Sequence, residues 1–208
     1  QYLDENTALE EVRNGNLDLY YNKISSDRLE NDEARKGLKV FDSTGGSYSL
    51  LVNPAESKKF NPFSNNEARF ALNYLVDRKL IVNELMGGYG SSIISYYGPT
   101  DPEYLTIIKE LESFNFKYNP LLAEKIISKS MTERGASKID NKWTMYGKEV
   151  EIKIFIRSDD PVRKSIGEIL SAELEKIGFA VKKDYGDLNK AFVVVYGSNP
   201  ADLNWNLY

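Results

Sequence analysis

The sequence predicts an α/β fold, and three neighbouring patterns towards the C-terminus support this prediction. Apolar residues alternate over Val150–Ile156, which is typical of a strand. They then recur at helical spacing over Val162–Ile177, and Gly178 follows as a stop signal. A second apolar run begins at Phe179–Val181. This order predicts a strand–helix–strand unit with a parallel pair of strands.

Composition narrows the possible functions before any motif is considered. The chain has 208 residues, of which 41% are hydrophobic and 28% are charged, which suits one large or two small globular domains. It contains no Cys and no His, so disulfides, thiol nucleophiles, imidazole bases and the commonest transition-metal ligands are excluded. A net charge of -4 disfavours nucleic acid as a partner.

The first 52 residues are expected to form a small α/β unit. Thr7–Glu10 resembles a capping box for a short helix that ends at Gly15. A helical turn is expected at Ser26–Asp32. Strands are expected at Leu17–Tyr21, Leu38–Phe41 and Tyr48–Val52.

A change in composition at residues 53–64 predicts a domain boundary. Pro54 and Pro62 bracket a polar stretch suited to an exposed connection. Ser64–Glu67 is a second capping box, followed by apolar residues at helical spacing up to Val76. Asp77 can cap another helix, which ends at Gly87-Gly88.

The remaining segments alternate between irregular and regular patterns. Residues 88–102 are rich in Gly, Pro and Tyr, which predicts a loop. A helix is expected at Pro120–Ser130, and Asp140-Asn141 predicts a turn between two short strands. The apolar run Phe192–Tyr196 predicts a strand covered on both faces, ended by Gly197. The sequence shows no internal repeat.

Several motifs stand in one order along the chain. Asn61-Pro62-Phe63 precedes Glu67–Arg78, which reads EARFALNYLVDR. Tyr118-Asn119-Pro120 precedes Ala123–Ile127, and Gly15–Asp18 stands near the start. Together they resemble the peptide/nickel class (family 5) of solute-binding proteins of ABC importers. The match is collinear over nearly the whole chain and covers less than half of a typical family member, so we expect a central fragment.

This resemblance implies a periplasmic-binding-protein-like fold of the type II flytrap kind, with one major lobe and part of a second. Residues 1–52 would belong to lobe I, residues 53–60 to an interlobe crossover, and residues 61–208 to the second major lobe. Closure of the lobes would trap an oligopeptide or a similar small polar solute and deliver it to a membrane permease. The expected location is extracytoplasmic, periplasmic or anchored at the cell surface as a lipoprotein, with no cofactor and no catalysis.

The resemblance also implies candidate ligand-binding residues. In the family, the loop after a strand that ends in glycine supplies an aromatic wall and an aspartate that holds a peptide's terminal amine. Here that loop would follow Tyr196-Gly197, with Ser198 where an aromatic residue is expected and Asp202 about one residue from the usual position. Asp202 could instead cap residues 203–208. The full set of candidates is Tyr48, Tyr196, Ser198, Asn199, Asp202 and Trp205, although large aromatic residues also pack in cores.

The residues also leave other functions open. A sugar or metal-chelate receptor on the same scaffold is the alternative within binding, whereas bare metal ions are disfavoured without His and Cys. Gly87–Gly90 lacks the strand and the lysine of a phosphate cradle and is interpreted as a helix stop. A carboxylate-dependent hydrolase is the alternative of a different class, although helix capping explains its candidate acids better. Those acids are Glu10-Glu11, Asp27, Asp32-Glu33 and Asp159-Asp160.

Overall fold

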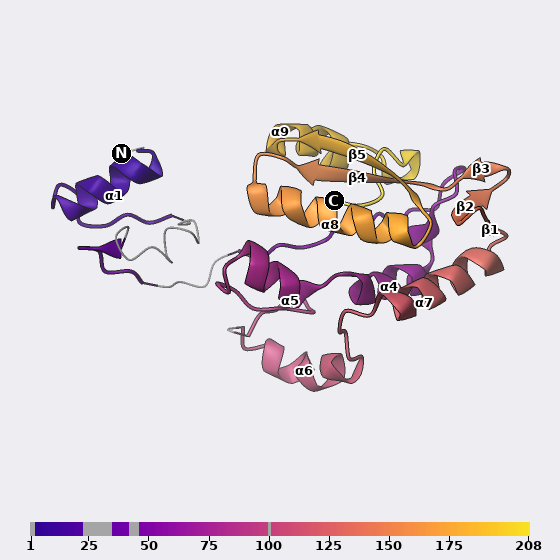
Figure 1. Ribbon diagram of the computed structural model, residues 1–208, viewed down its shortest axis with the longest axis horizontal. Coiled ribbons are helices and arrows are strands. Elements are labelled where there is room, and N and C mark those ends of the chain that lie inside the picture. The colour runs from indigo at the N-terminus through magenta and orange to yellow at the C-terminus, as the bar shows by residue number, and fades with distance from the viewer. Residues whose placement is uncertain (1–2, 23–34, 42–45, 100) are drawn as a thin grey trace.

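The computed structural model describes residues 3–22, 35–41, 46–99 and 101–208. Figure 1 shows α1 at one end of the molecule, whereas the strands of the described residues all lie in the body at the other end. The elements are α1 (Glu5–Arg13), η1 (Pro62–Ser64), α4 (Asn66–Leu75), α5 (Arg78–Leu80), η2 (Ile81–Leu85), α6 (Tyr104–Ser113), α7 (Pro120–Glu133), β1 (Ser137–Ile139), β2 (Lys142–Met145), β3 (Lys148–Glu149), β4 (Glu151–Arg157), α8 (Pro161–Lys176), β5 (Ala180–Gly186), α9 (Leu188–Ala191), η3 (Phe192–Tyr196) and η4 (Pro200–Asp202).

The predicted strand–helix–strand unit is confirmed. β4 and β5 pair in parallel, with Glu151 opposite Ala180 and Arg157 opposite Gly186. α8 connects them and packs along the pair (Figure 1). It approaches closely because position 167 is glycine: a Cβ there would come within 2.8 Å of the Ile156 side chain.

The C-terminal residues extend this sheet on the other side of β4. Leu207 forms a parallel bridge to Ile154 and an antiparallel bridge to Val52. Backbone hydrogen bonds join Leu51 to Tyr208 in both directions, at 2.7 and 2.9 Å. Residues 51–53 therefore pack on the body formed by residues 61–208, so this packing begins before the boundary expected at residue 53.

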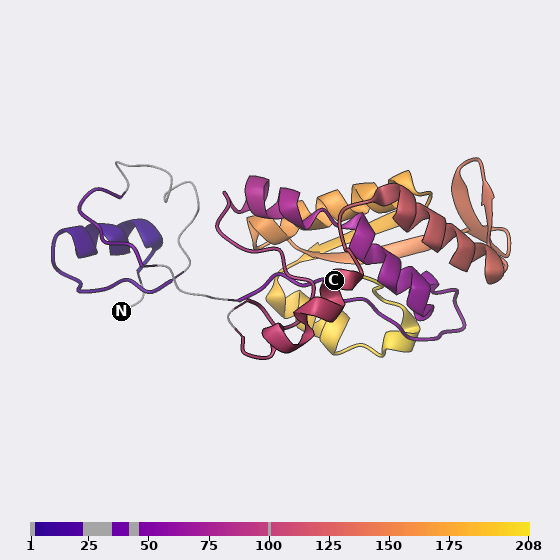
Figure 2. The same ribbon diagram turned by 90° about the horizontal axis from the view of Figure 1, so that it is seen from below.

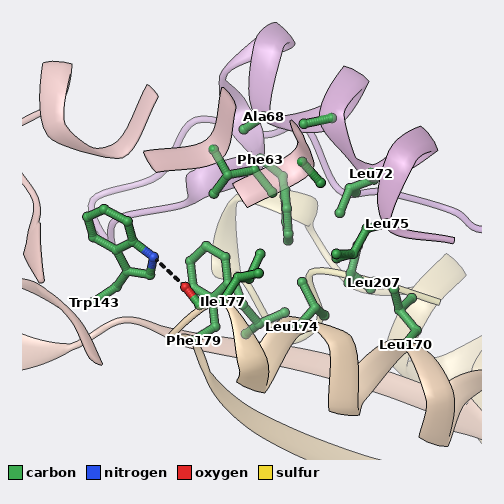
Figure 3. Packing of buried hydrophobic residues seen from close by; sticks show 14 of the residues in the cluster. Phe63, Ala68, Leu72, Leu75, Trp143, Leu170, Leu174, Ile177, Phe179 and Leu207 are labelled. Carbon is green, nitrogen blue, oxygen red and sulfur yellow. Dashed lines mark hydrogen bonds between the residues drawn. The ribbon is translucent and has the colours of Figure 1, made fainter. Parts of the chain in front are cut away.

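Side chains on the two faces of β4 enter two separate cores. Ile152, Ile154 and Ile156 join the larger core, whereas Phe155 on the opposite face joins Ala191, Val195 and Trp205. In the larger core, side chains of α8 meet those of η1 and α4, and the Trp143 indole donates to the Ile177 carbonyl at 3.0 Å (Figure 3). The residues labelled in that view are Phe63, Ala68, Leu72, Leu75, Trp143, Leu170, Leu174, Ile177, Phe179 and Leu207.

Most helix predictions are confirmed, although α4 is capped by Asn65 rather than by the predicted Ser64. The helix predicted after Asp77 is α-helical only over Arg78–Leu80 and continues as the π-helical turn Ile81–Leu85. The side chains of Asn65, Asp77 and Asn119 accept hydrogen bonds from the first turns of α4, α5 and α7. α1 begins earlier than predicted, since Asp4 rather than Thr7 caps it. The Asp140-Asn141 turn joins β1 to β2 with both residues at positive φ. α6 was not predicted.

Several strand predictions are wrong. Leu17–Tyr21 and Leu38–Phe41 form no strand, since neither has a pairing partner within the described residues. Tyr48–Val52 contributes only the single bridge at Val52. The prediction for Ser26–Asp32 lies outside the described residues.

Phe192–Tyr196 is a π-helical turn (η3) rather than a strand. Both edges of β4 are already occupied, by β5 and by residues 206–208, so this apolar run has no ladder to join. It coils instead, and the Gly197 N–H closes the turn on the Phe192 carbonyl at 2.8 Å. Phe192, Val193 and Tyr196 are consequently more than half exposed.

The segment expected to be an exposed connection is anchored at both ends. Asn53, Asn61 and Phe63 are fully or almost fully buried. The division of the chain into lobes stays a prediction.

Candidate functional site

The carboxyl ends of β4 and β5 lie at one edge of the sheet, where α8 begins. Open parallel sheets commonly bind ligands at this edge, since strand ends and helix starts present side chains and N–H groups there. Arg157 is the last residue of β4, and Asp159 and Asp160 lead into α8. Tyr208 ends the adjoining segment that runs parallel to β4.

Arg157 and Asp159 form a bidentate ion pair. The Arg157 Nε and Nη2 atoms donate to the two Asp159 carboxylate oxygens at 2.6 and 2.7 Å. These hydrogen bonds hold the pKa of Asp159 below its ordinary value. They also raise the pKa of Arg157, with a smaller contribution from the Tyr208 hydroxyl. The pair neutralises its own charge.

Asp160 links α8 to Tyr48. Its Oδ1 atom accepts from the N–H groups of Val162 and Arg163, at 2.9 and 3.1 Å, and so caps the helix. Its Oδ2 atom accepts from the Tyr48 hydroxyl at 3.5 Å and lies 3.4 Å from Arg163 Nε. The Arg163 guanidinium also lies over the Tyr48 ring, 5.1 Å from its centre.

Tyr196 and Tyr208 complete an aromatic group at this edge. Their rings meet edge to face at 5.8 Å, and Tyr208 contacts Phe155 in the same way. The pKa of Tyr196 is raised, mainly by burial of its hydroxyl and next by the neighbouring Tyr208. The Tyr196 side chain is nevertheless 55% exposed. We call Tyr48, Tyr196 and Tyr208 the tyrosine cluster.

The structure places Asp202 and Asn199 away from this cluster. Lys153 Nζ donates to the Leu203 carbonyl at 2.9 Å, so the neighbouring Asp202 lies beside the start of β4. Lys153 and Arg157 are four residues apart on an extended strand, which corresponds to about 13 Å. Asn199 belongs to the same end, since Asn53 donates to the carbonyl of the adjoining Pro200.

These residues have local structural roles. The Asn199 side chain accepts from the Ala201 N–H at 3.1 Å, and the Ser198 hydroxyl donates to the Val194 carbonyl at 2.6 Å. Asp202 is exposed at the end of η4 and caps no helix, because the chain beyond it is not helical. Trp205 is 6% exposed and packs in the smaller core. Of the six candidates, only Tyr48 and Tyr196 lie in the tyrosine cluster.

Arg157, Arg163 and Tyr208 were not among the site residues predicted from the sequence. The position of Arg157 at the end of a predicted strand, just before a predicted helix, was a usable signal. Asp159-Asp160 does not form a hydrolytic acid pair, since one carboxylate is bound to Arg157 and the other caps α8. Glu10-Glu11 lies on α1, and Asp27 and Asp32-Glu33 fall outside the described residues.

Two features are missing from the described part of the chain. No group of three or more acidic side chains there is placed to hold a metal ion. No helix there has both the length and the apolar character needed to cross a bilayer.

A parallel α/β unit with aromatic and charged side chains at the carboxyl ends of its strands is the arrangement of a ligand-binding domain. A protein-family model identifies the family to which this domain belongs. Residues 1–206 match the model for the middle part of the bacterial extracellular solute-binding proteins, family 5. The chain belongs to this family, as its motifs indicated.

Individual relatives are distant. The chain is 24% identical over 181 residues to the oligopeptide-binding protein AppA of Bacillus subtilis, a match that covers 86% of this chain and 31% of AppA. It is 28% identical over 117 residues to heme-binding protein A of Haemophilus influenzae, covering 56% of this chain and 19% of that protein. The chain thus spans less than a third of these curated relatives.

A solved structure confirms the fold. The mannohexaose-bound periplasmic oligopeptide-binding protein of Thermotoga maritima has a TM-score of 0.67 at 19% identity. The match covers 100% of this chain and 38% of that one. The predicted periplasmic-binding-protein-like fold is therefore confirmed.

Proposed function

We propose that this chain is part of the solute-binding component of an ABC importer, which captures an oligopeptide or a similar small polar solute and delivers it to a membrane permease. Membership of family 5 supports this proposal, as does the likeness to AppA, an oligopeptide-binding protein. The protein would work outside the cytoplasmic membrane, in the periplasm or anchored at the cell surface as a lipoprotein. It would catalyse no reaction.

The main structural support is the tyrosine cluster at the carboxyl ends of β4 and residues 206–208. It offers aromatic faces and phenol hydroxyls beside two ion pairs, Arg157–Asp159 and Arg163–Asp160. Aromatic walls with a few fixed polar groups are typical of small-molecule sites. Side chains committed to caps and ion pairs can orient a ligand, but they provide no activated nucleophile.

The lobe arrangement is part of the same proposal. Residues 1 to about 47 would belong to one lobe, and residues 61–208 with the packed segment 48–53 to part of the other. The ligand would lie between the lobes, with the tyrosine cluster as one wall. Such sites enclose about 70 to 90% of a small ligand, so both walls are needed for full affinity.

An oligosaccharide is the second candidate solute. Both arginines are paired with carboxylates, so the cluster offers the exposed ring of Tyr196 and the partly exposed rings of Tyr48 and Tyr208 without an unpaired charge in the described residues. Flat apolar rings with hydroxyl partners suit sugars as well as peptides. The Thermotoga maritima relative was crystallised with mannohexaose bound. A metal-chelate receptor has no comparable support in this site.

Calorimetry on the full-length protein tests the proposal. The ligands would be peptides of two to nine residues and manno-oligosaccharides of two to six units. We expect one class to bind, and Tyr196→Ala to weaken binding by about tenfold or more, equivalent to about 1.4 kcal/mol. Tyr146→Ala is the matched control, since Tyr146 is 87% exposed at a hairpin turn. Equal effects of the two substitutions would exclude the tyrosine cluster from the site.

Asp202 has a separate test, because a role as amine anchor would place the ligand at the other end of β4. Asp202→Asn would then weaken peptides with a free N-terminus at least about tenfold more than N-acetylated peptides. The geometry favours equal, small effects on both kinds of peptide. A selective loss would move the site to η4.

A further inference from the structure

A cavity of about 330 Å³ lies far from the tyrosine cluster, where the segment after α6 meets α4 and the start of α7. It is lined by Tyr74, Phe114, Asn115, Lys117, Tyr118, Asn119 and Leu122. The Tyr118 hydroxyl donates a hydrogen bond to Glu173 of α8, which lies 13 residues beyond Asp160. At 1.5 Å per residue this corresponds to about 20 Å, so the cavity is separate from the proposed solute site.

Hydrogen bonds fix the walls of this cavity. The Tyr74 hydroxyl donates to the Phe114 carbonyl at 3.0 Å, and the Asn119 N–H donates to the Tyr74 carbonyl at 2.8 Å. The Tyr118 hydroxyl donates to the buried Glu173 carboxylate at 2.8 Å. Burial and this bond raise the pKa of Tyr118 to about 12, so the phenol keeps its proton. The cavity is therefore preformed.

Aromatic rings supply its apolar surface. Phe114 is 40% exposed and Tyr118 is 41% exposed, although both are large apolar rings. Phe116 stacks against Phe114 at 5.4 Å between ring centres, which supports that ring. A flat apolar ligand would cover surface that is now in water.

Two polar groups at the cavity are not used by the fold. Lys117 forms no ion pair with any residue in the described ranges, and the side-chain amide of Asn115 forms no hydrogen bond there. Asn119 differs, because its side chain already caps α7. Asn115 lies at a backbone turn with φ 49°, and both it and Lys117 line the cavity. An ammonium and an amide beside aromatic walls suit an aromatic anion.

We propose that this cavity binds a small aromatic carboxylate, with its ring against Phe114 and Tyr118 and its carboxylate on Lys117 and Asn115. The same chemistry occurs in free arylacetic acids and in a C-terminal aromatic residue of a peptide. The volume is near the lower limit of ligand sites, about 300 Å³, and it accommodates one ring with a short acidic side chain.

Ligand-observed NMR titrations on the full-length protein test this inference. The probes are phenylacetate, neutral 2-phenylethanol and cationic phenethylamine, which share one ring and differ in charge. We expect phenylacetate to bind at least about tenfold more tightly than phenethylamine. N-acetylphenylalanine and its amide distinguish the two sources of the aromatic carboxylate. Tighter binding of N-acetylphenylalanine than of phenylacetate would indicate a peptide C-terminus as the better ligand. Weaker binding would indicate a free arylacetic acid.

Paired substitutions locate the site. Lys117→Met should reduce phenylacetate affinity about tenfold, to the level of 2-phenylethanol, whereas Lys109→Met, the same change on exposed α6, should leave it unchanged. Phe114→Leu should weaken all three probes. Absence of phenylacetate binding, or equal affinity in Lys117→Met and Lys109→Met, would overturn the proposal. Solute capture is tested separately, because Tyr196→Ala changes the tyrosine cluster and leaves this cavity intact.

Discussion

Replacing Asn61 by alanine should destabilise the chain far more than an ordinary surface change. Asn61 is 1% exposed, and its amide makes four hydrogen bonds. Its Nδ2 atom donates to the carbonyls of Asn53 and Ala55 at 3.0 and 2.9 Å. Its Oδ1 atom accepts from the Phe63 N–H at 3.1 Å and from Asn206 Nδ2 at 3.2 Å.

The size of the expected loss in the free energy of unfolding follows from the hydrogen-bonding groups that are left without partners. Asn61→Ala leaves one hydrogen-bonding group without a partner on each of three buried residues, Asn53, Phe63 and Asn206. Each such buried group without a partner costs about 1 to 3 kcal/mol, so the free energy of unfolding should fall by at least about 3 kcal/mol. Asn65→Ala is the matched control, because its side chain makes one capping bond to Ala68 and its loss costs about 1 kcal/mol.

Urea unfolding of the 208-residue chain measures both variants. Its only two tryptophans, Trp143 and Trp205, are buried and report on the larger and the smaller core. A loss for Asn61→Ala no greater than for Asn65→Ala would refute the view that this amide network holds the C-terminal segment. Different midpoints at unchanged slope would show that stability, rather than compactness, has changed.

Two further stability predictions use the same assay. Gly178→Ala should lower the free energy of unfolding by about 2 kcal/mol or more, because the φ of Gly178 is +101° and a Cβ would lie 2.8 Å from the Asn141 carbonyl oxygen. Gly147 has a φ of +74° with open space around it, so Gly147→Ala should cost about half as much. Equal costs of the two substitutions would contradict the steric argument. Hydrogen bonds from Lys183 and then Tyr185 lower the pKa of Glu168, so its contribution to stability is present above the ordinary carboxyl pKa and is lost as pH falls through the lowered value. Glu168→Gln should therefore flatten the acid side of the stability curve, and an unchanged acid side would refute this.

Helices were predictable because their determinants are local. The caps of α4, α7 and α8 are Asn65, Asn119 and Asp160, each within three residues of the N–H groups it accepts from. Apolar spacing then identified the buried faces. α6 escaped prediction because no cap bond marks its start and none of its residues is fully buried.

Strands were less predictable because a strand requires a partner. Phe192–Tyr196 has the β-branched composition of a central strand, yet the neighbouring positions are filled from elsewhere in the chain. The same long-range dependence hid most of the site. Tyr48 and Asp160 are 112 residues apart in sequence, and no local pattern brings them together.

The short segment at residues 206–208 links stability to the candidate site. It is too short for a regular ladder, and the N–H groups of Asn206 and Leu207 share the single carbonyl of Lys153. The Asn206 side chain compensates by accepting from the Lys153 N–H at 2.8 Å and donating to Asn61. This amide network sets the position of Tyr208, which in turn packs on Tyr196 and contributes to the hydrogen bonding of Arg157. A core substitution at Asn61 should therefore also disturb the tyrosine cluster, although Asn61 itself touches none of its members.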